Sequence, residues 1–295
     1  MTEAATENTG STMPAATRQT DVHRMCGPAR AEQVNDCVVV EEPVTIMVHR
    51  VGSFTVMCTP VDIEALAVGF LFSEGMIDGA DEVLALHTKE QTGHVVGVEI
   101  ERWSQFEVQR NLIVASSCGM CGVRNIEKML ANIPPCARSL EIEGSLLQEV
   151  MENLRSQQCL FRATGSAHAA AVFTPDGAIH AVAEDIGRHS ALDKAIGKCL
   201  LARKPLAGLG VALSGRVSLE MVAKAARAGI ELIVAVSGVS SLAVSAAQQW
   251  NITLCGFVRQ GKANIYTHPE RVRFSNNGRY TYAAQESRPE LDNQI

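Results

Sequence analysis

The spacing of apolar residues along the chain changes near residue 145. Before that point, short apolar runs predict strands at 38–40, 45–48, 54–57, 95–100 and 106–115. One amphipathic helix lies among them, with Asp62 at its start and Gly75 as its stop. Because these elements follow no repeating order, the front part of the chain predicts a small mixed α+β unit.

After residue 145, helices and strands alternate. A helix at 146–154 and a hairpin of strands at 169–173 and 178–183 come first, and three strand–helix units follow. Those units place helices at 190–201, 219–228 and 242–250, and strands at 209–213, 232–236 and 252–257. This order is typical of an α/β domain with a mixed, largely parallel sheet and helices on both faces.

Pattern and composition together divide the chain into four segments. Residues 1–36 lack the apolar side chains that would offset the entropy of ordering, so a disordered N-terminal tail is expected there. The small α+β domain then covers 37–144, the α/β domain covers 145–270, and a C-terminal tail covers 271–295.

The composition narrows the class of protein. The 295 residues are 46% hydrophobic and carry a formal net charge of -6, whereas a general nucleic-acid binder would be basic. No apolar run is long enough for a membrane span, and the first residues lack a secretory signal. The nine cysteines are odd in number and mostly scattered, which favours reduced thiols. We therefore expect a cytoplasmic protein without nucleic-acid or membrane partners.

Three polar loops follow predicted strands of the α/β domain and precede its helices, at 184–189, 214–218 and 237–241. In open α/β sheets, ligands bind beyond the carboxyl ends of parallel strands. Backbone N–H groups at helix starts attract anions, and Arg188 and Arg216 add positive charge. The loops thus predict a phosphate or nucleotide crevice, with ordinary helix caps and surface arginines as the alternative.

Three side chains near these loops have two interpretations each. His168, at the start of an apolar strand, is either a buried, hydrogen-bonded histidine or a site residue. Glu184 and Asp185 form either a carboxylate pair for acid–base chemistry or, in the case of Asp185, a helix cap.

The sequence Cys118-Gly119-Met120-Cys121 carries the strongest chemical signal. It could be half of a zinc site, but the sequence offers no second such pair and no well-spaced histidine pair. A thiol–disulfide pair is a second possibility, although the aromatic and proline setting of thioredoxins is missing. A persulfide carrier is the third, because Gly119 and Gly122 would give the thiols a mobile loop. Spacing alone does not separate the last two.

The chain resembles the formate dehydrogenase accessory protein family (FdhD) in a series of stretches from residue 41 to residue 267. Those stretches read EEPVTIMV, TPVDIEALAVGFLFSEGMI, SSCGMCG, TGSAHAAA, EDIGRHSALDKAIG, SGRVSLEMVAKAARAGI, SSLAVSAA and LCGFVRQGKANIYT. SSCGMCG and EDIGRHSALDK are the most specific of them.

The resemblance implies a sulfurtransferase. A cysteine desulfurase would load a persulfide on Cys118, and the sulfur would pass to a molybdenum bis(molybdopterin guanine dinucleotide) cofactor that is destined for formate dehydrogenase. Cys121 would assist the transfer or protect Cys118. GDP-like nucleotides are expected to bind, and the family's cofactor-binding stretch falls on Phe257, Val258, Arg259, Gln260, Gly261 and Lys262. The neighbouring loops add Arg188, His189, Ser214, Gly215 and Arg216 as binding candidates.

The family also suggests a fold and an assembly. Its second domain is similar to cytidine deaminases, so the resemblance implies a three-layer α/β/α domain behind the smaller α+β domain. The corresponding helix starts, at 184–189 and 214–220, lack the cysteines of a deaminase zinc site, so no zinc is expected. A homodimer is expected by the same analogy.

Overall fold

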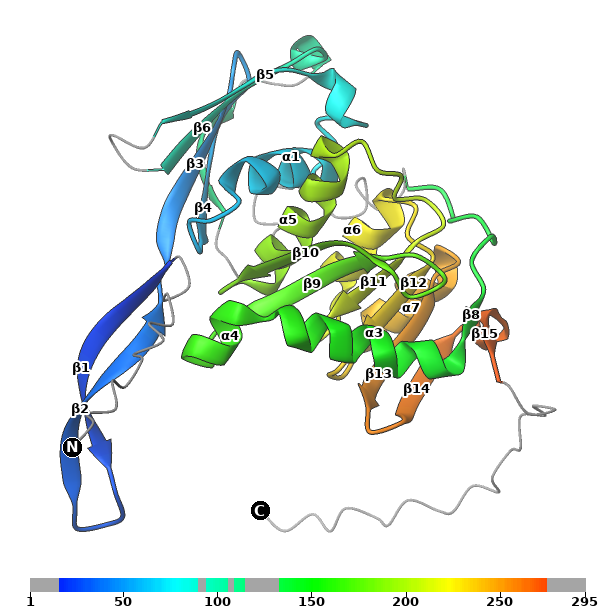
Figure 1. Cartoon of the computed structure of the whole chain (residues 1–295). Coiled ribbons are helices and arrows are strands. Elements are labelled where there is room, and N and C mark those ends of the chain that lie inside the picture. Colours follow the sequence, from blue (N-terminus) through cyan, green and yellow to red (C-terminus); the bar gives the residue numbers. More distant parts are fainter. Residues whose placement is uncertain (1–15, 90–93, 106–108, 115–132, 275–295) are drawn as a thin grey trace, which may run out of the picture.

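The computed structural model describes residues 16–89, 94–105, 109–114 and 133–274 (Figure 1). Nearly every element that the apolar pattern predicts is present within them, with ends shifted by a few residues. None of the helices in these segments is long and apolar enough to cross a membrane.

A six-stranded sheet forms the centre of the C-terminal part. Its strands are β9 (His168–Phe173), β10 (Ile179–Asp185), β11 (Gly210–Leu213), β12 (Leu232–Ala235), β13 (Thr253–Arg259) and β14 (Lys262–Thr267), in the spatial order β10-β9-β11-β12-β13-β14. Only β11 with β12 and β12 with β13 pair in parallel. The sheet is mixed, as predicted, but "largely parallel" is wrong, because the hairpins β9–β10 and β13–β14 and the pair β9–β11 are all antiparallel.

Helices cover both faces of this sheet. Helix α3 (Gly144–Gln157) packs on one face, and α5 (Arg188–Leu201), α6 (Leu219–Arg227) and α7 (Ser241–Gln249) pack on the other (Figure 1). Alternate residues of β9 point to opposite faces, so Ala171 and Phe173 meet α3 while Ala170 and Val172 face α5. The layers are therefore α/β/α. The further likeness to cytidine deaminases stays a prediction.

The N-terminal part holds a second, five-stranded sheet. Its strands are β3 (Glu42–Val48), β4 (Gly52–Cys58), β5 (Val83–Lys89), β6 (His94–Ile100) and β7 (Gln109–Val114), in the order β5-β6-β3-β4-β7. Val44, Ile46 and Val98 belong to one buried cluster with helix α1 (Ile63–Ser73), and this cluster continues into α5 and α6. The two sheets thus share one hydrophobic core.

Helices α1 and α5 touch backbone to backbone. A Cβ atom added at Gly69 would overlap the carbonyl of Asp193, and one added at Gly197 would overlap the carbonyl of Ala65. Only glycine leaves room for so close a crossing at these two positions. The crossing joins the N-terminal sheet to the helix layer of the six-stranded sheet.

Two buried ion pairs flank this crossing. Lys194 Nζ lies 2.6 Å from Asp185 Oδ2 and also donates to the carbonyl of Thr59 (2.8 Å). Lys224 Nζ lies 2.7 Å from Asp193 Oδ2, and Asp193 also accepts from the hydroxyl of Ser73. Each pair therefore connects α5 to the N-terminal part through an additional hydrogen bond.

Residues 17–36 do not form the disordered tail that their composition predicts. They belong to a hairpin of β1 (Thr17–Met25) and β2 (Ala31–Val39), which pair antiparallel from Thr17↔Val39 to Met25↔Ala31. Most of its side chains are exposed, so its stability comes from backbone pairing and from packing against α4 (Cys159–Thr164) rather than from apolar burial. A criterion based on apolar content misses such an element.

The remaining short elements belong to both parts of the chain. Strand β8 (Ile142–Glu143) pairs in parallel with β15 (Val272–Arg273), so the fold reaches beyond the predicted limits of 145 and 270. Short 3-10 helices lie at η1 (Ala80–Glu82), η2 (Trp103–Gln105) and η3 (Pro269–Arg271). Fully buried Glu231 accepts hydrogen bonds from the backbone N–H groups of Ser139 and Leu140, which anchors the chain before β8.

Replacing Gly69 or Gly197 by alanine should destabilise the protein by about 1–3 kcal/mol or more, because the added methyl group forces α1 and α5 apart. Urea unfolding measures the effect. Gly97→Ala is the matched control, since its Cβ would meet only the carbonyl of His87, at 3.7 Å. Equal unfolding midpoints for all three variants would contradict the crossing.

Candidate functional site

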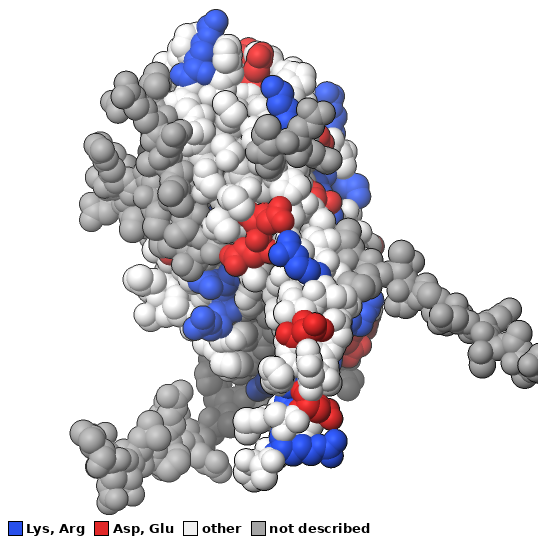
Figure 2. Space-filling view, turned by 90° about the vertical axis from the view of Figure 1, so that its left-hand side faces the viewer, with Lys and Arg blue, Asp and Glu red and all other residues white. Residues whose placement is uncertain are grey.

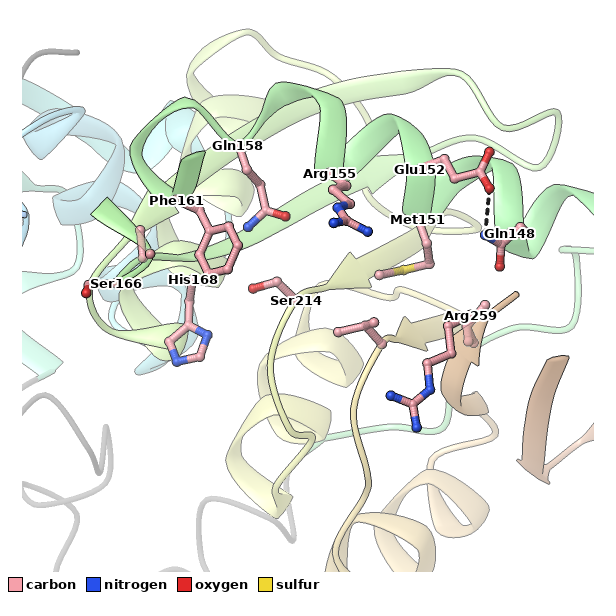
Figure 3. Close-up of a pocket in the computed structure, with 14 residues that line it drawn as sticks. Gln148, Met151, Glu152, Arg155, Gln158, Phe161, Ser166, His168, Ser214 and Arg259 are labelled. Carbon is pink, nitrogen blue, oxygen red and sulfur yellow. Dashed lines mark hydrogen bonds between the residues drawn. The ribbon is translucent and has the colours of Figure 1, made fainter. Parts of the chain in front are cut away.

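A pocket of about 500 Å³ opens between α3 and the edge of the six-stranded sheet where its parallel strands end (Figure 3). Ser214, Val236 and Val258 line it from the ends of β11, β12 and β13. Strand β9 runs antiparallel to β11, which brings its first residue, His168, to the same edge. The pocket lies where open α/β sheets bind ligands.

Three of the predicted binding residues, Ser214, Val258 and Arg259, line this pocket. The hydroxyl of Ser214 accepts from the backbone N–H of Ala169 at 2.8 Å, and the N–H of Ser214 donates to the carbonyl of Ala169 at 3.0 Å. These two bonds fix the loop after β11 against β9. The serine hydroxyl keeps its proton available for a ligand.

Gly215, Arg188 and Arg216 lie beside the pocket, next to His168. A Cβ at Gly215 would stand 3.2 Å from His168 Nδ1 and 3.6 Å from Arg188 Cβ, so the loop after β11 packs against both the histidine and the start of α5. Burial lowers the pKa of His168, and the positive charges of Arg188 and Arg216 lower it further. His168 is therefore a neutral imidazole beside two cations, and it lines the pocket.

His189 does not reach the pocket. It is 3% exposed and lies within α5, with Nε2 3.9 Å from Glu220 Oε2, and neither ring nitrogen has a hydrogen-bond partner among the described residues. Burial, followed by the charges of Lys224 and Arg188, lowers the pKa of His189 to about 4. The side chain is an uncharged part of the helix layer.

The rest of the predicted stretch, beyond Val258 and Arg259, surrounds the β13–β14 turn. Gln260 and Gly261, with φ values of 54° and 71°, form this turn, and Phe257, with a φ of 55°, lies where the register of β13 is irregular. The Phe257 ring lies against Gly238 of the preceding loop, and Lys262 is exposed. These four residues are close to the pocket in the chain but are not among the residues that line it.

Glu184 and Asp185 hold the backbone rather than form an acid–base pair. The two oxygens of Glu184 accept from the N–H groups of Leu160 and Phe161, at 2.8 and 2.9 Å. Asp185 pairs with Lys194 and accepts from the N–H of Gly187, just before α5, at 2.7 Å. The contact with Gly187 orders the turn before α5 but does not reach the N–H groups of that helix, so Asp185 is not its cap. Glu184, by contrast, accepts from two of the first N–H groups of α4.

The pocket wall opposite the strand ends was not anticipated. It is formed by one side of α3 and by α4, through Gln148, Met151, Glu152, Arg155, Gln158 and Phe161 (Figure 3). The apolar spacing predicts α3 but says only which of its residues are buried. Helix α4 is too short to give a periodic signal. Which polar residues of α3 face a ligand depends on the sheet beneath the helix.

Cys118 and Cys121 lie outside the described residues. The cysteines within the described segments are free thiols, and four of them are buried. Burial raises the pKa of Cys58 and Cys255 to about 12 and that of Cys136 and Cys199 to about 11, so these four are inert as nucleophiles. The described part of the chain contains no cluster of three or more His, Cys, Asp and Glu residues that could hold a metal ion.

The face that the N-terminal sheet and the β1–β2 hairpin present, on the left of Figure 1, mixes charges of both signs (Figure 2). Basic and acidic side chains alternate over its visible part, and the hairpin itself carries the pair Arg30 and Glu32.

Comparison with known proteins gives consistent matches over most of the chain. The model of the FdhD/NarQ family matches residues 39–273. "Sulfur carrier protein FdhD" of Bordetella parapertussis is 38% identical over 83% of this chain and 91% of its own length. The protein of the same name from Picrophilus torridus is 38% identical over 81% and 93%. The crystal structure of a candidate formate dehydrogenase accessory protein from Desulfotalea psychrophila superimposes with a TM-score of 0.71 at 25% identity, and it covers 88% of this chain and all of that one.

The lowered pKa of His189 predicts a pH-dependent stability. Its contribution to the free energy of unfolding is complete above pH 6.5 and is lost as the pH falls towards about 4, because the unfolded state takes up the proton first. Between pH 7 and pH 5 this amounts to about 2 kcal/mol. Urea unfolding at both pH values should show a smaller loss for His189→Gln than for the wild type.

The wild type must be compared with His189→Gln because the titration of Glu74 changes the free energy of unfolding with pH in the opposite direction. Burial raises its pKa to about 7, so its contribution is present at low pH and is lost as the pH rises from 4.5 to about 7. Identical pH dependence of wild type and His189→Gln would contradict the assignment.

Proposed function

The chain belongs to the FdhD/NarQ family, and on that premise we propose that it is a sulfur carrier in the maturation of formate dehydrogenase. The match extends over residues 39–273, and relatives named as sulfur carriers align over nine-tenths of their own length. The proposal therefore concerns the whole protein rather than one shared domain.

The proposed chemistry begins at Cys118. Its thiolate attacks the outer sulfur of a persulfide on a cysteine desulfurase, the donor cysteine leaves as a thiolate, and Cys118 carries the persulfide. Attack of Cys121 on the inner sulfur would release the outer one as sulfide, with its electron pair, and leave a Cys118–Cys121 disulfide. The four buried cysteines with raised pKa values are unsuited to this work. Cys26, Cys37 and Cys159 are accessible thiols, but none of them lies in a CxxC pair, so the motif is what favours Cys118 as the carrier.

The proposed acceptor is the molybdenum of a bis(molybdopterin guanine dinucleotide), bound as substrate. The observation that supports this acceptor is the pocket at the strand ends. There Ser214, Val258 and Arg259 come together from two motifs far apart in the sequence. Arg259 supplies a guanidinium group that can bind phosphate. Because His168 is neutral, an anion at this edge of the sheet would be flanked by the two charges of Arg188 and Arg216. A homodimer and a cytoplasmic location belong to the same proposal.

Cys118→Ala should abolish sulfur loading. After incubation with a cysteine desulfurase and cysteine, intact-mass measurement should show a gain of about 32 Da, one sulfur atom, on the wild type and on the control variant but not on Cys118→Ala. Cys26→Ala is the matched control, because Cys26 is an exposed thiol on the hairpin. Cells with Cys118→Ala should lack active formate dehydrogenase.

The same measurement separates the competing functions. A wild type that gains no sulfur but cycles between thiols and a Cys118–Cys121 disulfide would be a thiol–disulfide oxidoreductase. A Cys118→Ala protein that still matures formate dehydrogenase would be a cofactor-insertion chaperone without covalent transfer.

Arg259→Ala should weaken GDP binding by about 10- to 100-fold, as expected when a charged hydrogen bond to phosphate is lost. Lys262→Ala should have a smaller effect, because Lys262 is exposed and outside the lining. Isothermal calorimetry gives both affinities, and sulfur loading of Cys118 should stay unchanged in both variants. Unaltered GDP affinity of Arg259→Ala would rule this pocket out as the nucleotide site.

A further inference from the structure

We propose that the corner between α3 and α4 is the base-binding end of the nucleotide site, and that Glu184 is the positioning residue that holds it. The inference rests on the proposed function and deepens it. It assigns a polarity to the pocket, with the phosphates at one end and the base at the other, and it gives roles to residues of α3 and α4 that no motif of the sequence marks.

The phosphate end lies between two arginines. Arg155 extends into the pocket from α3, and Arg259 faces it from the end of β13 (Figure 3). They are the two basic residues among those that line the pocket, besides the neutral His168. Guanidinium groups on opposite walls can bind one diphosphate from both sides, with charge-assisted hydrogen bonds to different oxygens.

The base end lies around Phe161 and Gln158. The Phe161 ring lines the pocket and is 42% exposed, although it is large and apolar. An exposed aromatic face beside polar side chains is a stacking surface for a nucleobase. Gln158, which is 6% exposed, directs its carboxamide into the same end, toward Ser214 (Figure 3). An amide offers both a donor and an acceptor, as the polar edge of a base requires.

Glu184 determines where Phe161 stands. Helix α4 is only six residues long, and its first N–H groups have no partner inside the helix. The carboxylate of Glu184 accepts from two of them, the N–H of Leu160 and that of Phe161 itself. Because Glu184 lies on β10 of the central sheet, it attaches the stacking residue to the rigid part of the molecule.

The packing around α4 supports this assignment. Leu160 is buried, whereas its neighbour Phe161 remains half-exposed toward the pocket. The β1–β2 hairpin also contacts α4. The helix is thus restrained by the sheet through Glu184 and by the hairpin, and its aromatic side chain is left available for a ligand.

Two probes, GDP and inorganic pyrophosphate, test the polarity by calorimetry on the full chain. Phe161→Ala should weaken GDP binding by about 5- to 100-fold and leave pyrophosphate binding unchanged, because it removes only stacking. Phe161→Tyr should retain GDP affinity. Arg155→Ala should weaken both probes by a similar factor, whereas Arg24→Ala, an exposed arginine on the hairpin, should change neither.

Glu184→Ala should reproduce the selective loss of GDP binding seen with Phe161→Ala, and Glu184→Gln, which keeps one acceptor oxygen, should recover part of it. A merely structural role would instead lower the affinity for both probes together with the unfolding midpoint, and that result would overturn the positioning role.

The outcomes also separate this inference from the proposed function. If the wild type binds GDP and neither Phe161→Ala nor Arg155→Ala changes its affinity, the polarity is wrong and the proposed function stands. If the wild type binds neither probe, the nucleotide part of the proposed function fails, and the inference fails with it.

Discussion

The crossing of α1 and α5 is the contact on which the rest of the structure depends. Gly69 and Gly197 let the two backbones touch, and this contact places the N-terminal sheet against the helix layer of the six-stranded sheet. Helix α5 begins at Arg188, beside the pocket, so the same helix that receives α1 also forms part of the pocket's edge. A shift of α5 relative to α1 would therefore move both the N-terminal sheet and the edge of the pocket.

Buried charge makes this junction specific. Asp185 and Lys194 are fully buried, and such a pair is stable only when its remaining hydrogen-bonding groups are satisfied. Thr59 satisfies them from the N-terminal part, through its backbone N–H to Asp185 and its carbonyl to Lys194. Asp193 and Lys224 repeat this arrangement with Ser73. A different docking of the two parts would leave these charges unpaired, so the polar contacts select one arrangement among those that the apolar core would allow.

Neighbouring residues in the stretch from Glu184 to His189 contact different parts of the structure. Glu184 accepts hydrogen bonds from α4 in the pocket wall, and Asp185 accepts one from Thr59 of the N-terminal part. Arg188 contributes positive charge beside the pocket. His189 is an uncharged residue of the helix interior. This stretch is one of those that carry the family resemblance, and the contacts of its residues are mainly with the protein itself, since none of them lines the pocket.

The sequence by itself determined the local elements and the edge at which the site lies. The periods of two and 3.6 residues in apolar spacing are local properties of the chain. Loops that follow successive parallel strands must meet at one edge of a sheet, as Ser214 after β11 and Val236 after β12 do at the pocket. Only the tertiary structure decided which neighbours these residues have. The antiparallel edges of the sheet, the exposed β1–β2 hairpin and the wall of α3 and α4 depend on pairings and packing between distant segments. Polar residues such as Arg155 and Gln158 carry no period of their own, so their place in the pocket follows from the fold that surrounds them.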